Sequence, residues 1–325
     1  MEQRTLGRSG LVVGRLALGT MTWGRDTDED DAAAQLRAFV AAGGTLVDTA
    51  DVYVAGESER ILGRLLQEVV PQDDVLIATK AFGATGPTAM GRGSSRSHLL
   101  SALDASLRRL GVDHVDLWQL HAWDEATPLE ETLAAVDTAV DSGRVRYVGV
   151  SNFSGWQSAQ AATWQRAWPG RAPLVSTQME YSLLQRGVER EVIPACRALG
   201  LGLLPWSPLG RGVLTGKYRY ATPSDSRGAS AHLKGFVEDL LGEDSAGVVE
   251  AVATAADGLG TSPLAVALAW VRDRPGVTAP VVGARTVGQL LGSLAAEDLE
   301  LPAEIRAALD DVSAPELGYP EFRLT

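Results

Sequence analysis

Four residues in the first 121 positions carry groups suited to acid chemistry: Asp48, Tyr53, Lys80 and His121. A tyrosine hydroxyl alone is a poor acid near neutrality, because its ordinary pKa is about 10. A nearby ammonium stabilises the phenolate and lowers that pKa, and a carboxylate beyond the ammonium keeps it charged and in place. An imidazole opposite could donate a hydrogen bond to a carbonyl oxygen and orient it. Together these side chains predict a site that protonates an oxygen atom.

The use of lysine supports this interpretation. The chain has 29 basic residues, of which three are lysines: Lys80, Lys217 and Lys234. Lysine carries a compact ammonium whose pKa shifts readily, whereas arginine carries a planar guanidinium that is always charged. Each residue also has a plainer explanation: Asp48 as a helix cap, Tyr53 as a packing aromatic and Lys80 as a solvated strand end. A Schiff-base lyase that uses Lys80 is a further alternative.

Short apolar runs alternate with longer amphipathic stretches along the chain. The runs cover residues 16–18, 45–47, 75–78, 115–120, 145–150, 174–177, 201–204 and 278–282. The stretches include residues 30–42, 97–110, 129–142 and 187–199, and glycines follow each of them, as at helix ends. Eight repeats of strand and helix predict an α/β fold, a (β/α)8 TIM barrel, with a doubly wound open sheet as the alternative.

Two segments depart from this rhythm. Residues 5–13 predict a small N-terminal β-hairpin that covers the N-terminal end of the barrel. Residues 218–245 are rich in Ser, Gly, Asp and Arg without periodicity, which predicts a long loop after strand 7. No linker divides the chain, so residues 1–325 are expected to form a single domain.

In such a barrel the active site lies at the C-terminal ends of the strands. The residues that follow the predicted strands are polar, and they include all four acid-chemistry residues. The remaining histidines, His98, His114 and His232, are expected at the surface or in loops. With no His-x-x-x-His pair and one cysteine, Cys196, a zinc site is not expected. Reducing equivalents would then come from an organic cofactor.

The bulk composition excludes several classes of function. The 325 residues are 45% hydrophobic and 22% charged, which is ordinary for a globular protein, and the net charge is −12. An acidic chain is not expected to bind nucleic acid. No apolar run approaches 18 residues, so no membrane span is expected. A single cysteine and the absence of an apolar signal core predict a cytoplasmic protein, which we expect to be a monomer.

The motifs at the predicted rim resemble the aldo-keto reductase family. They are Asp48-Thr49-Ala50-Asp51-Val52-Tyr53 with Ser58-Glu59, Thr79-Lys80, Leu120-His121, Gly149-Val150-Ser151-Asn152-Phe153, Pro205-Trp206-Ser207-Pro208-Leu209, Gly216-Lys217-Tyr218 and Val282-Gly283-Ala284-Arg285 with Gln289. They span nearly the whole chain in the family's order. The Trp206-Ser207-Pro208 segment is most similar to the bacterial branch related to potassium-channel β subunits.

The resemblance implies an NADP(H)-dependent enzyme that reduces an aldehyde or ketone to an alcohol. Tyr53 would be the general acid, tuned by Lys80 and Asp48, and His121 would orient the carbonyl. Trp206, or alternatively Tyr181, would stack on the nicotinamide. The positions implied to contact the cofactor are Gly19, Thr20, Met21, Asp48, Ser151, Asn152, Gln178, Trp206, Ser207, Pro208, Leu209, Gly210, Arg211, Lys217, Gly283, Arg285 and Gln289.

Two points remain open within this interpretation. Trp23 and Trp123 follow the first and fourth predicted strands, where they would either wall the substrate pocket with Tyr53 and His121 or pack the rim. The family's Glu-Asn pair near the adenine is replaced by Gly292 and Ser293, so the choice of NADP over NAD depends mainly on Arg285. A second function consistent with the resemblance is a redox sensor or regulatory subunit that binds NADP(H) and turns over slowly.

Overall fold

Eight parallel strands form the centre of the molecule in a computed structural model that describes residues 1–224, 226–316 and 318. They are β3 (Ala17–Gly19), β4 (Leu46–Asp48), β5 (Leu76–Ala81), β6 (Val115–Leu120), β7 (Val145–Ser151), β8 (Leu174–Glu180), β9 (Gly202–Trp206) and β10 (Val281–Gly283). Their order is β10-β3-β4-β5-β6-β7-β8-β9, and a parallel bridge joins Leu203 on the edge strand β9 to Val277, four residues ahead of the other edge strand β10. The nearly closed barrel confirms the predicted fold class and excludes an open doubly wound sheet.

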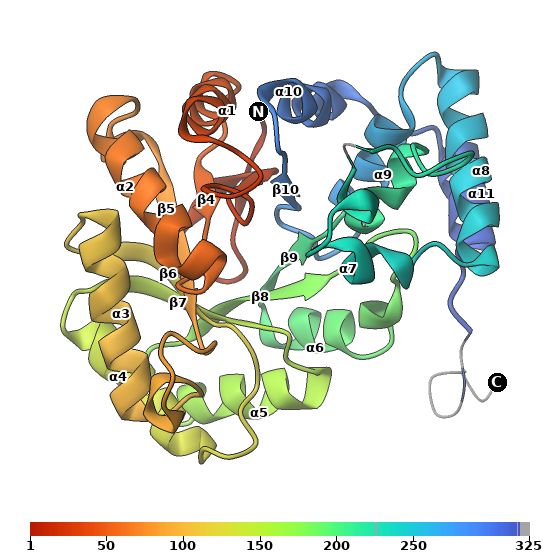
Figure 1. Ribbon diagram of the computed structural model, residues 1–325. Coiled ribbons are helices and arrows are strands. Elements are labelled where there is room, and N and C mark those ends of the chain that lie inside the picture. The colour runs from red at the N-terminus through yellow and green to blue at the C-terminus, as the bar shows by residue number, and fades with distance from the viewer. Residues whose placement is uncertain (225, 317, 319–325) are drawn as a thin grey trace.

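Helices surround the barrel, and most follow a strand directly (Figure 1). They are α1 (Glu29–Ala41), α2 (Glu57–Glu68), α3 (Arg96–Leu110), α4 (Leu129–Asp141), α5 (Gly155–Arg166), α6 (Val192–Leu199), α7 (Lys234–Glu238), α8 (Glu243–Leu259), α9 (Pro263–Arg272), α10 (Val287–Leu294) and α11 (Ala303–Val312). No single described helix is long and apolar enough to cross a bilayer; α8 and α9 meet that test only together, with a bend of 102° between them.

The helix ends follow from local chemistry. The Ser95 hydroxyl accepts a hydrogen bond from the His98 N–H at the start of α3, and α3 ends at Gly111 with φ of 69°. Ser95 and Gly111 thus supply the side-chain cap and the left-handed residue that helix termini favour. The predicted helix over 187–199 is shorter than expected: a 3₁₀ turn covers Gly187–Glu189, and α6 begins at Val192.

The predicted N-terminal hairpin is confirmed. Strands β1 (Gln3–Thr5) and β2 (Val12–Gly14) pair antiparallel, and Leu6 and Leu11 pack with apolar side chains from inside the barrel. The turn approaches the barrel so closely that a Cβ on Gly7 would lie 2.3 Å from the Val175 carbonyl oxygen. With φ of 58°, Gly7 meets both the steric and the conformational requirement of this turn.

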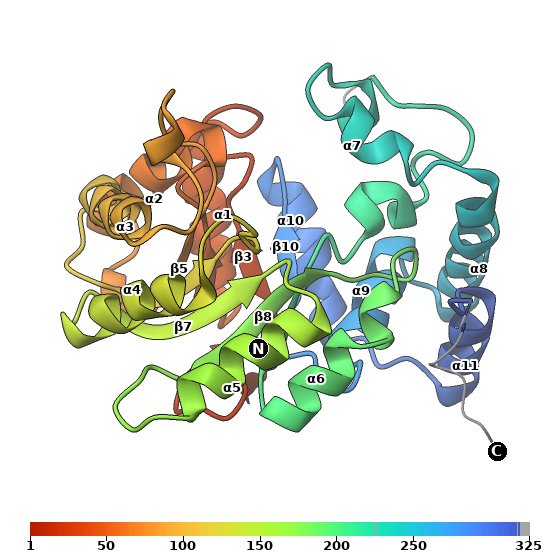
Figure 2. The same ribbon diagram turned by 90° about the horizontal axis from the view of Figure 1, so that it is seen from below.

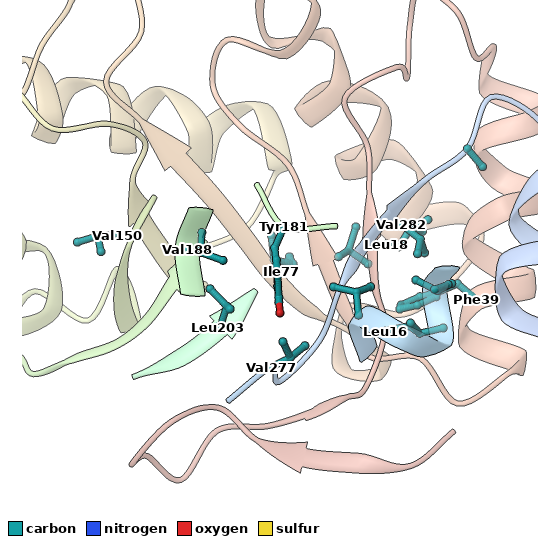
Figure 3. Packing of buried hydrophobic residues seen from close by; sticks show 14 of the residues in the cluster. Leu16, Leu18, Phe39, Ile77, Val150, Tyr181, Val188, Leu203, Val277 and Val282 are labelled. Carbon is teal, nitrogen blue, oxygen red and sulfur yellow. The ribbon is translucent and has the colours of Figure 1, made fainter. Parts of the chain in front are cut away.

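The larger core lies between the strands and the helices (Figure 3). Leu16, Leu18 and Phe39 are fully buried there, and the fully buried Tyr181 lies among the same apolar side chains. The Tyr181 hydroxyl donates a hydrogen bond to Glu189 Oε1 at 2.6 Å. Tyr181 is therefore a core residue. Of the two aromatic residues considered for stacking on the nicotinamide, Trp206 is the one that reaches the rim.

The segment 218–245 contains more structure than the sequence predicted. A 3₁₀ turn covers Arg227–Ala229, α7 lies within the expected loop, and α8 begins at Glu243, before the segment ends. Figure 2 shows α7 standing off the ring of helices, connected by extended chain. A helix of five residues gives no periodic signal, because its one buried residue, Val237, is fixed by tertiary contacts.

Candidate active site

A cavity of about 490 Å³ opens at the C-terminal ends of the barrel strands. It brings together residues from all three thirds of the chain. Most of the residues implied for catalysis and cofactor binding line it: Gly19, Met21, Asp48, Tyr53, His121, Ser151, Asn152, Gln178, Trp206, Ser207, Pro208, Leu209, Arg211, Lys217, Gly283, Arg285 and Gln289.

Lys80 lies behind the cavity wall and connects the acid-chemistry residues. Its Nζ donates to Asp48 Oδ2 at 2.6 Å, to the Thr49 carbonyl oxygen at 2.8 Å and to the Tyr53 hydroxyl at 3.3 Å. Lys80 is fully buried, so its ammonium depends on these acceptors. The three donated bonds fix the Nζ between the carboxylate and the phenol.

The barrel strands explain this geometry. Asp48 ends β4 and Lys80 lies near the end of β5, and β4 and β5 pair in parallel. The second carboxylate oxygen of Asp48, Oδ1, accepts hydrogen bonds from Gln119 Nε2 at 3.1 Å and from Gln178 Nε2 at 2.9 Å. Both oxygens of Asp48 are thus occupied, so the carboxylate is held rigidly against the ammonium.

Burial and charge set the protonation states. Burial disfavours the charged form of Lys80, but the Asp48 carboxylate and the Tyr53 hydroxyl outweigh it and raise the pKa of the lysine. Burial raises the pKa of Tyr53, while the neighbouring Lys80 ammonium acts in the lowering direction. At neutral pH the ammonium is charged and the phenol keeps its proton, as an acid must.

His121 faces Tyr53, with the rings edge to face and their centroids 6.1 Å apart. Burial, and secondly the Lys80 ammonium, lower the pKa of His121 to about 3. The imidazole is therefore neutral over the physiological range. A neutral ring can donate one hydrogen bond to a carbonyl oxygen without competing with the phenol as the proton source.

A hydrogen-bonded group lies beside the acid residues at the ends of β7 and β9. Asn152 Nδ2 donates to the His121 carbonyl oxygen at 3.0 Å, and Trp206 Nε1 donates to Asn152 Oδ1 at 3.1 Å. The φ of Asn152 is 57°, a left-handed conformation that asparagine tolerates better than most residues. The single asparagine of the chain therefore fixes the Trp206 ring at the cavity wall.

Positive charge gathers at another part of the cavity wall, where Lys217, Arg227 and Arg285 contribute side chains. Arg227 is not among the residues implied by the sequence, because it lies in the segment 218–245, which has no pattern to orient a side chain. Burial and the neighbouring Arg285 lower the pKa of the Arg227 guanidinium. Clustered cations raise the local positive potential, which favours the binding of an anion at this part of the wall.

Some implied site residues lie elsewhere. Thr20 is fully buried and its hydroxyl hydrogen-bonds with that of Ser58, and Gly210 is buried outside the described cavity lining. Trp23 is fully buried, with Nε1 donating to Gln35 Oε1 at 3.1 Å, so it packs the core and lies outside the described lining of this cavity. Trp123 packs edge-on against Phe153 and Trp156, outside the described cavity lining.

Two further histidines can be placed. The expectation that His98 lies at the surface is wrong: it is buried in α3, and its Nε2 has no hydrogen-bond partner among the described residues. His232 is exposed in the segment 218–245, where its Nε2 lies 3.2 Å from Asp26 Oδ2 in the loop after β3. This contact joins two loops of the rim.

The helix α7 is fastened to the rim by Arg211. Its guanidinium forms two hydrogen bonds of 2.8 Å with Glu180 at the end of β8, and Nη1 donates to the Phe236 carbonyl oxygen at 2.6 Å. The Phe236 ring lies nearly parallel to Trp206 with centroids 6.4 Å apart, and it lines the cavity. Arg211 thus positions α7, and Phe236 adds an aromatic wall that the sequence analysis did not include.

The eight-stranded barrel and the positions of Asp48, Tyr53, Lys80 and His121 match the arrangement that the family resemblance implied. A model of the Aldo/keto reductase family matches residues 15–314, and the chain belongs to this family. That membership confirms the resemblance described above and places the chain among oxidoreductases.

Curated relatives cover nearly the whole chain. The uncharacterized oxidoreductase YrpG of Bacillus subtilis (strain 168) is 40% identical over 96% of this chain and 96% of its own length. A protein of Oryza sativa subsp. japonica, named as a probable voltage-gated potassium channel subunit beta, is 36% identical over 99% and 98%. The L-glyceraldehyde 3-phosphate reductase of Escherichia coli (strain K12) is 34% identical over 89% and 86%. The similarity to potassium-channel β subunits agrees with the predicted branch.

Proposed function

We propose that this protein is an NADP(H)-dependent reductase that converts an aldehyde or ketone into an alcohol. The observation that carries the proposal is the position of Lys80 Nζ, which lies between the Asp48 carboxylate at 2.6 Å and the Tyr53 hydroxyl at 3.3 Å. Tyr53 lies at the cavity wall beside the neutral ring of His121. A protonated phenol, a fixed ammonium and a neutral hydrogen-bond donor are the groups that carbonyl reduction requires of the protein.

The residues present fit NADP(H). The amide-bearing side chains and Trp206 line the cavity with Tyr53, and a cluster of three cations suits phosphate groups. NADPH, when bound, supplies the hydride that a carbonyl carbon accepts. The residues that would hold it are Ser151, Asn152, Gln178 and Trp206 toward the nicotinamide, Ser207, Leu209 and Lys217 along the pyrophosphate, and Arg227, Arg285 and Gln289 at the adenosine phosphate.

The side chains of the protein supply the proton and the field around it. The Tyr53 hydroxyl donates its proton to the carbonyl oxygen, and the Lys80 ammonium stabilises the phenolate that remains. Asp48 keeps the ammonium charged and immobile, since it accepts from Lys80 while two glutamines hold its other oxygen. His121 donates a hydrogen bond to the same carbonyl oxygen and orients it toward Tyr53.

Removing the Tyr53 hydroxyl tests the proposed acid. Tyr53→Phe is expected to lower kcat by about 10²–10⁴-fold, the usual contribution of a positioned acid, while NADPH still binds. The measurement is NADPH absorbance with a panel of aldehydes, ketones and sugars, together with fluorescence quenching on addition of NADPH. Tyr220→Phe is the matched control, because Tyr220 is 87% exposed. Wild-type turnover in Tyr53→Phe would show that another group is the acid.

The cationic part of the cavity predicts the cofactor preference. Arg285→Ala and Arg227→Ala are each expected to raise KM for NADPH by about ten- to a hundredfold, because each removes a charge-assisted hydrogen bond to phosphate. KM for NADH, which lacks that phosphate, is expected to stay within about threefold of the wild type. Steady-state kinetics with both cofactors measures the ratio, and Arg60→Ala serves as a surface control. Equal effects on both cofactors would argue against a contact to the adenosine phosphate.

A slowly turning redox sensor is the second candidate, because the segment over the rim is fastened at two points. Arg211 holds α7, and His232 contacts Asp26 across the rim. Both contacts would slow cofactor release, and relatives named as channel β subunits share most of the chain. A release rate of NADP(H) far below the rate of hydride transfer would favour the sensor. The lyase alternative is disfavoured, because a protonated lysine with three acceptors is no nucleophile.

A further inference from the structure

A second carboxyl, Asp51, is buried behind the acid group and has no part in the chemistry described so far. It is 2% exposed, and within the described chain neither of its oxygens accepts a hydrogen bond of normal geometry. Its backbone N–H donates to the Lys80 carbonyl oxygen at 3.2 Å, so Asp51 lies against the end of β5. A buried carboxyl group that accepts no hydrogen bond is costly to ionise. The protonation state of Asp51 can therefore differ from that of an ordinary carboxyl group.

The charged groups around Asp51 come from three neighbouring elements: Glu59 on α2, Arg109 on α3 and Lys80 on β5. Glu59 is itself satisfied, since Thr79 Oγ1 donates to its Oε1 and Arg109 Nε to its Oε2, both at 2.6 Å. Arg109 therefore pairs with Glu59 and does not hydrogen-bond Asp51, which has the negative charge of Glu59 nearby. The cluster holds two carboxyl groups, and its arginine pairs with one of them.

This environment favours a proton on Asp51. Burial, and secondly the Glu59 carboxylate, raise the pKa of Asp51 to about 7, against the opposing effects of Arg109, the Val52 N–H and Lys80. Burial and the Asp48 carboxylate raise the pKa of Tyr53, and the Asp51 carboxylate, when charged, adds to that rise. Because interacting groups affect each other equally, loss of the phenol proton in turn makes Asp51 hold its proton more tightly.

We propose, on the basis of the carbonyl-reductase function above, that Asp51 is a positioning residue: it acts through Tyr53 and controls how readily that hydroxyl gives up its proton. When Asp51 is neutral, Asp48 is the one carboxylate of the two that still opposes the effect of the Lys80 ammonium on Tyr53, and reduction is faster. When Asp51 is charged, Tyr53 is a weaker acid and its phenolate is a stronger base. The rate of reduction then falls and the rate of alcohol oxidation rises. Proton uptake by Asp51 comes from solvent and involves no other reactant.

Three other titratable groups of the site do not change charge near pH 7, so they do not mask an effect of Asp51 on the reduction rate. The pKa of His121 is about 3, and the pKa values of Tyr53 and Lys80 are raised above their ordinary positions near 10. Among these groups Asp51 is the one that changes charge near neutrality. A dependence of the reduction rate on pH near 7 is therefore attributable to Asp51 once its variant has been measured.

The experiment compares wild type, Asp51→Asn and Asp73→Asn from about pH 5.5 to about pH 9. The probe is 4-nitrobenzaldehyde with saturating NADPH, and the reverse reaction uses the corresponding alcohol with NADP⁺. Asparagine keeps the shape of the neutral acid but cannot ionise. Asp73→Asn makes the same change of charge at an exposed position.

We expect kcat/KM for reduction by wild type and by Asp73→Asn to fall about three- to tenfold as pH rises through about 7. Asp51→Asn is expected to lose this step and to keep the low-pH rate at high pH, and the opposite change is expected for alcohol oxidation. A step that persists unchanged in Asp51→Asn overturns the proposal, and so does a uniform loss of rate at all pH values.

Absence of turnover in the wild type would count against the reductase function and not against Asp51 as a proton-holding group. In that case the pH dependence of unfolding of wild type and Asp51→Asn still decides whether Asp51 binds a proton near neutrality. Parallel stability curves for the two proteins would overturn the proposal independently of activity.

Discussion

Replacing Lys80 by methionine is expected to abolish turnover and to lower the free energy of unfolding by about 3–5 kcal/mol. Methionine fills a similar volume, so the loss comes from the missing ammonium. The Asp48 carboxylate would stay buried with Gln119 and Gln178 as side-chain donors but without a cation. Tyr53 would lose the charge that stabilises its phenolate. Urea unfolding and NADPH oxidation measure the two effects.

A double variant separates the two losses. Lys80→Met combined with Asp48→Asn removes the unpaired charge, so we expect it to recover most of the stability but none of the activity. Lys234→Met is the matched control, because Lys234 forms an exposed pair with Glu238 at 3.3 Å and its loss is expected to cost less than about 1 kcal/mol. If the double variant were as unstable as Lys80→Met, the buried charge would not be the cause. If Lys80→Met kept its activity, the proposed tuning of Tyr53 would be wrong.

The barrel could be predicted because buried parallel strands leave a simple mark in the sequence. Each is a short apolar run, and all eight runs became strands, with shifts of one to three residues at most of their ends. The rule that the C-terminal rim holds the site then selects Asp48, Tyr53, Lys80 and His121. The Lys80–Asp48 contact follows from the register of β4 and β5, which places both residues at the same end of adjacent strands.

What could not be predicted depends on contacts between distant parts of the chain. Gln178 holds Asp48 across 130 positions of sequence, which no local pattern reveals. The orientation of Trp23 is likewise a tertiary matter, since a tryptophan at a strand end can turn to the rim or to Gln35 in α1. Phe236 reaches the cavity because Arg211 draws α7 onto the rim, and Arg227 lies on a separate 3₁₀ turn in which the Gly228 N–H donates to the Tyr218 hydroxyl. Such loop contacts override weak local preferences.

Replacing Asp51 by asparagine is expected to stabilise the protein relative to the wild type as the pH rises. The folded-state pKa of Asp51 is raised from 3.8 to about 7, so the folded protein binds a proton that the unfolded chain has already lost. The corresponding stability is fully present below about pH 4 and is lost as pH rises through about 7. Between about pH 5 and about pH 8 we expect the wild type to lose about 2–3 kcal/mol relative to Asp51→Asn.

Urea unfolding of both proteins at several pH values measures this difference directly. Asp73→Asn, with an exposed carboxyl, is expected to follow the wild type throughout, which controls for the change in net charge. An asparagine that cannot fit the cavity of a neutral acid would lower stability by the same amount at every pH. The ionisation of Asp51 is therefore reported by how the stability difference between the two proteins changes with pH, and not by the size of that difference at any one pH. A constant difference would mean that Arg109 and Lys80 neutralise Asp51 as fully as they do Glu59 and Asp48, and that Tyr53 feels no change of charge from behind.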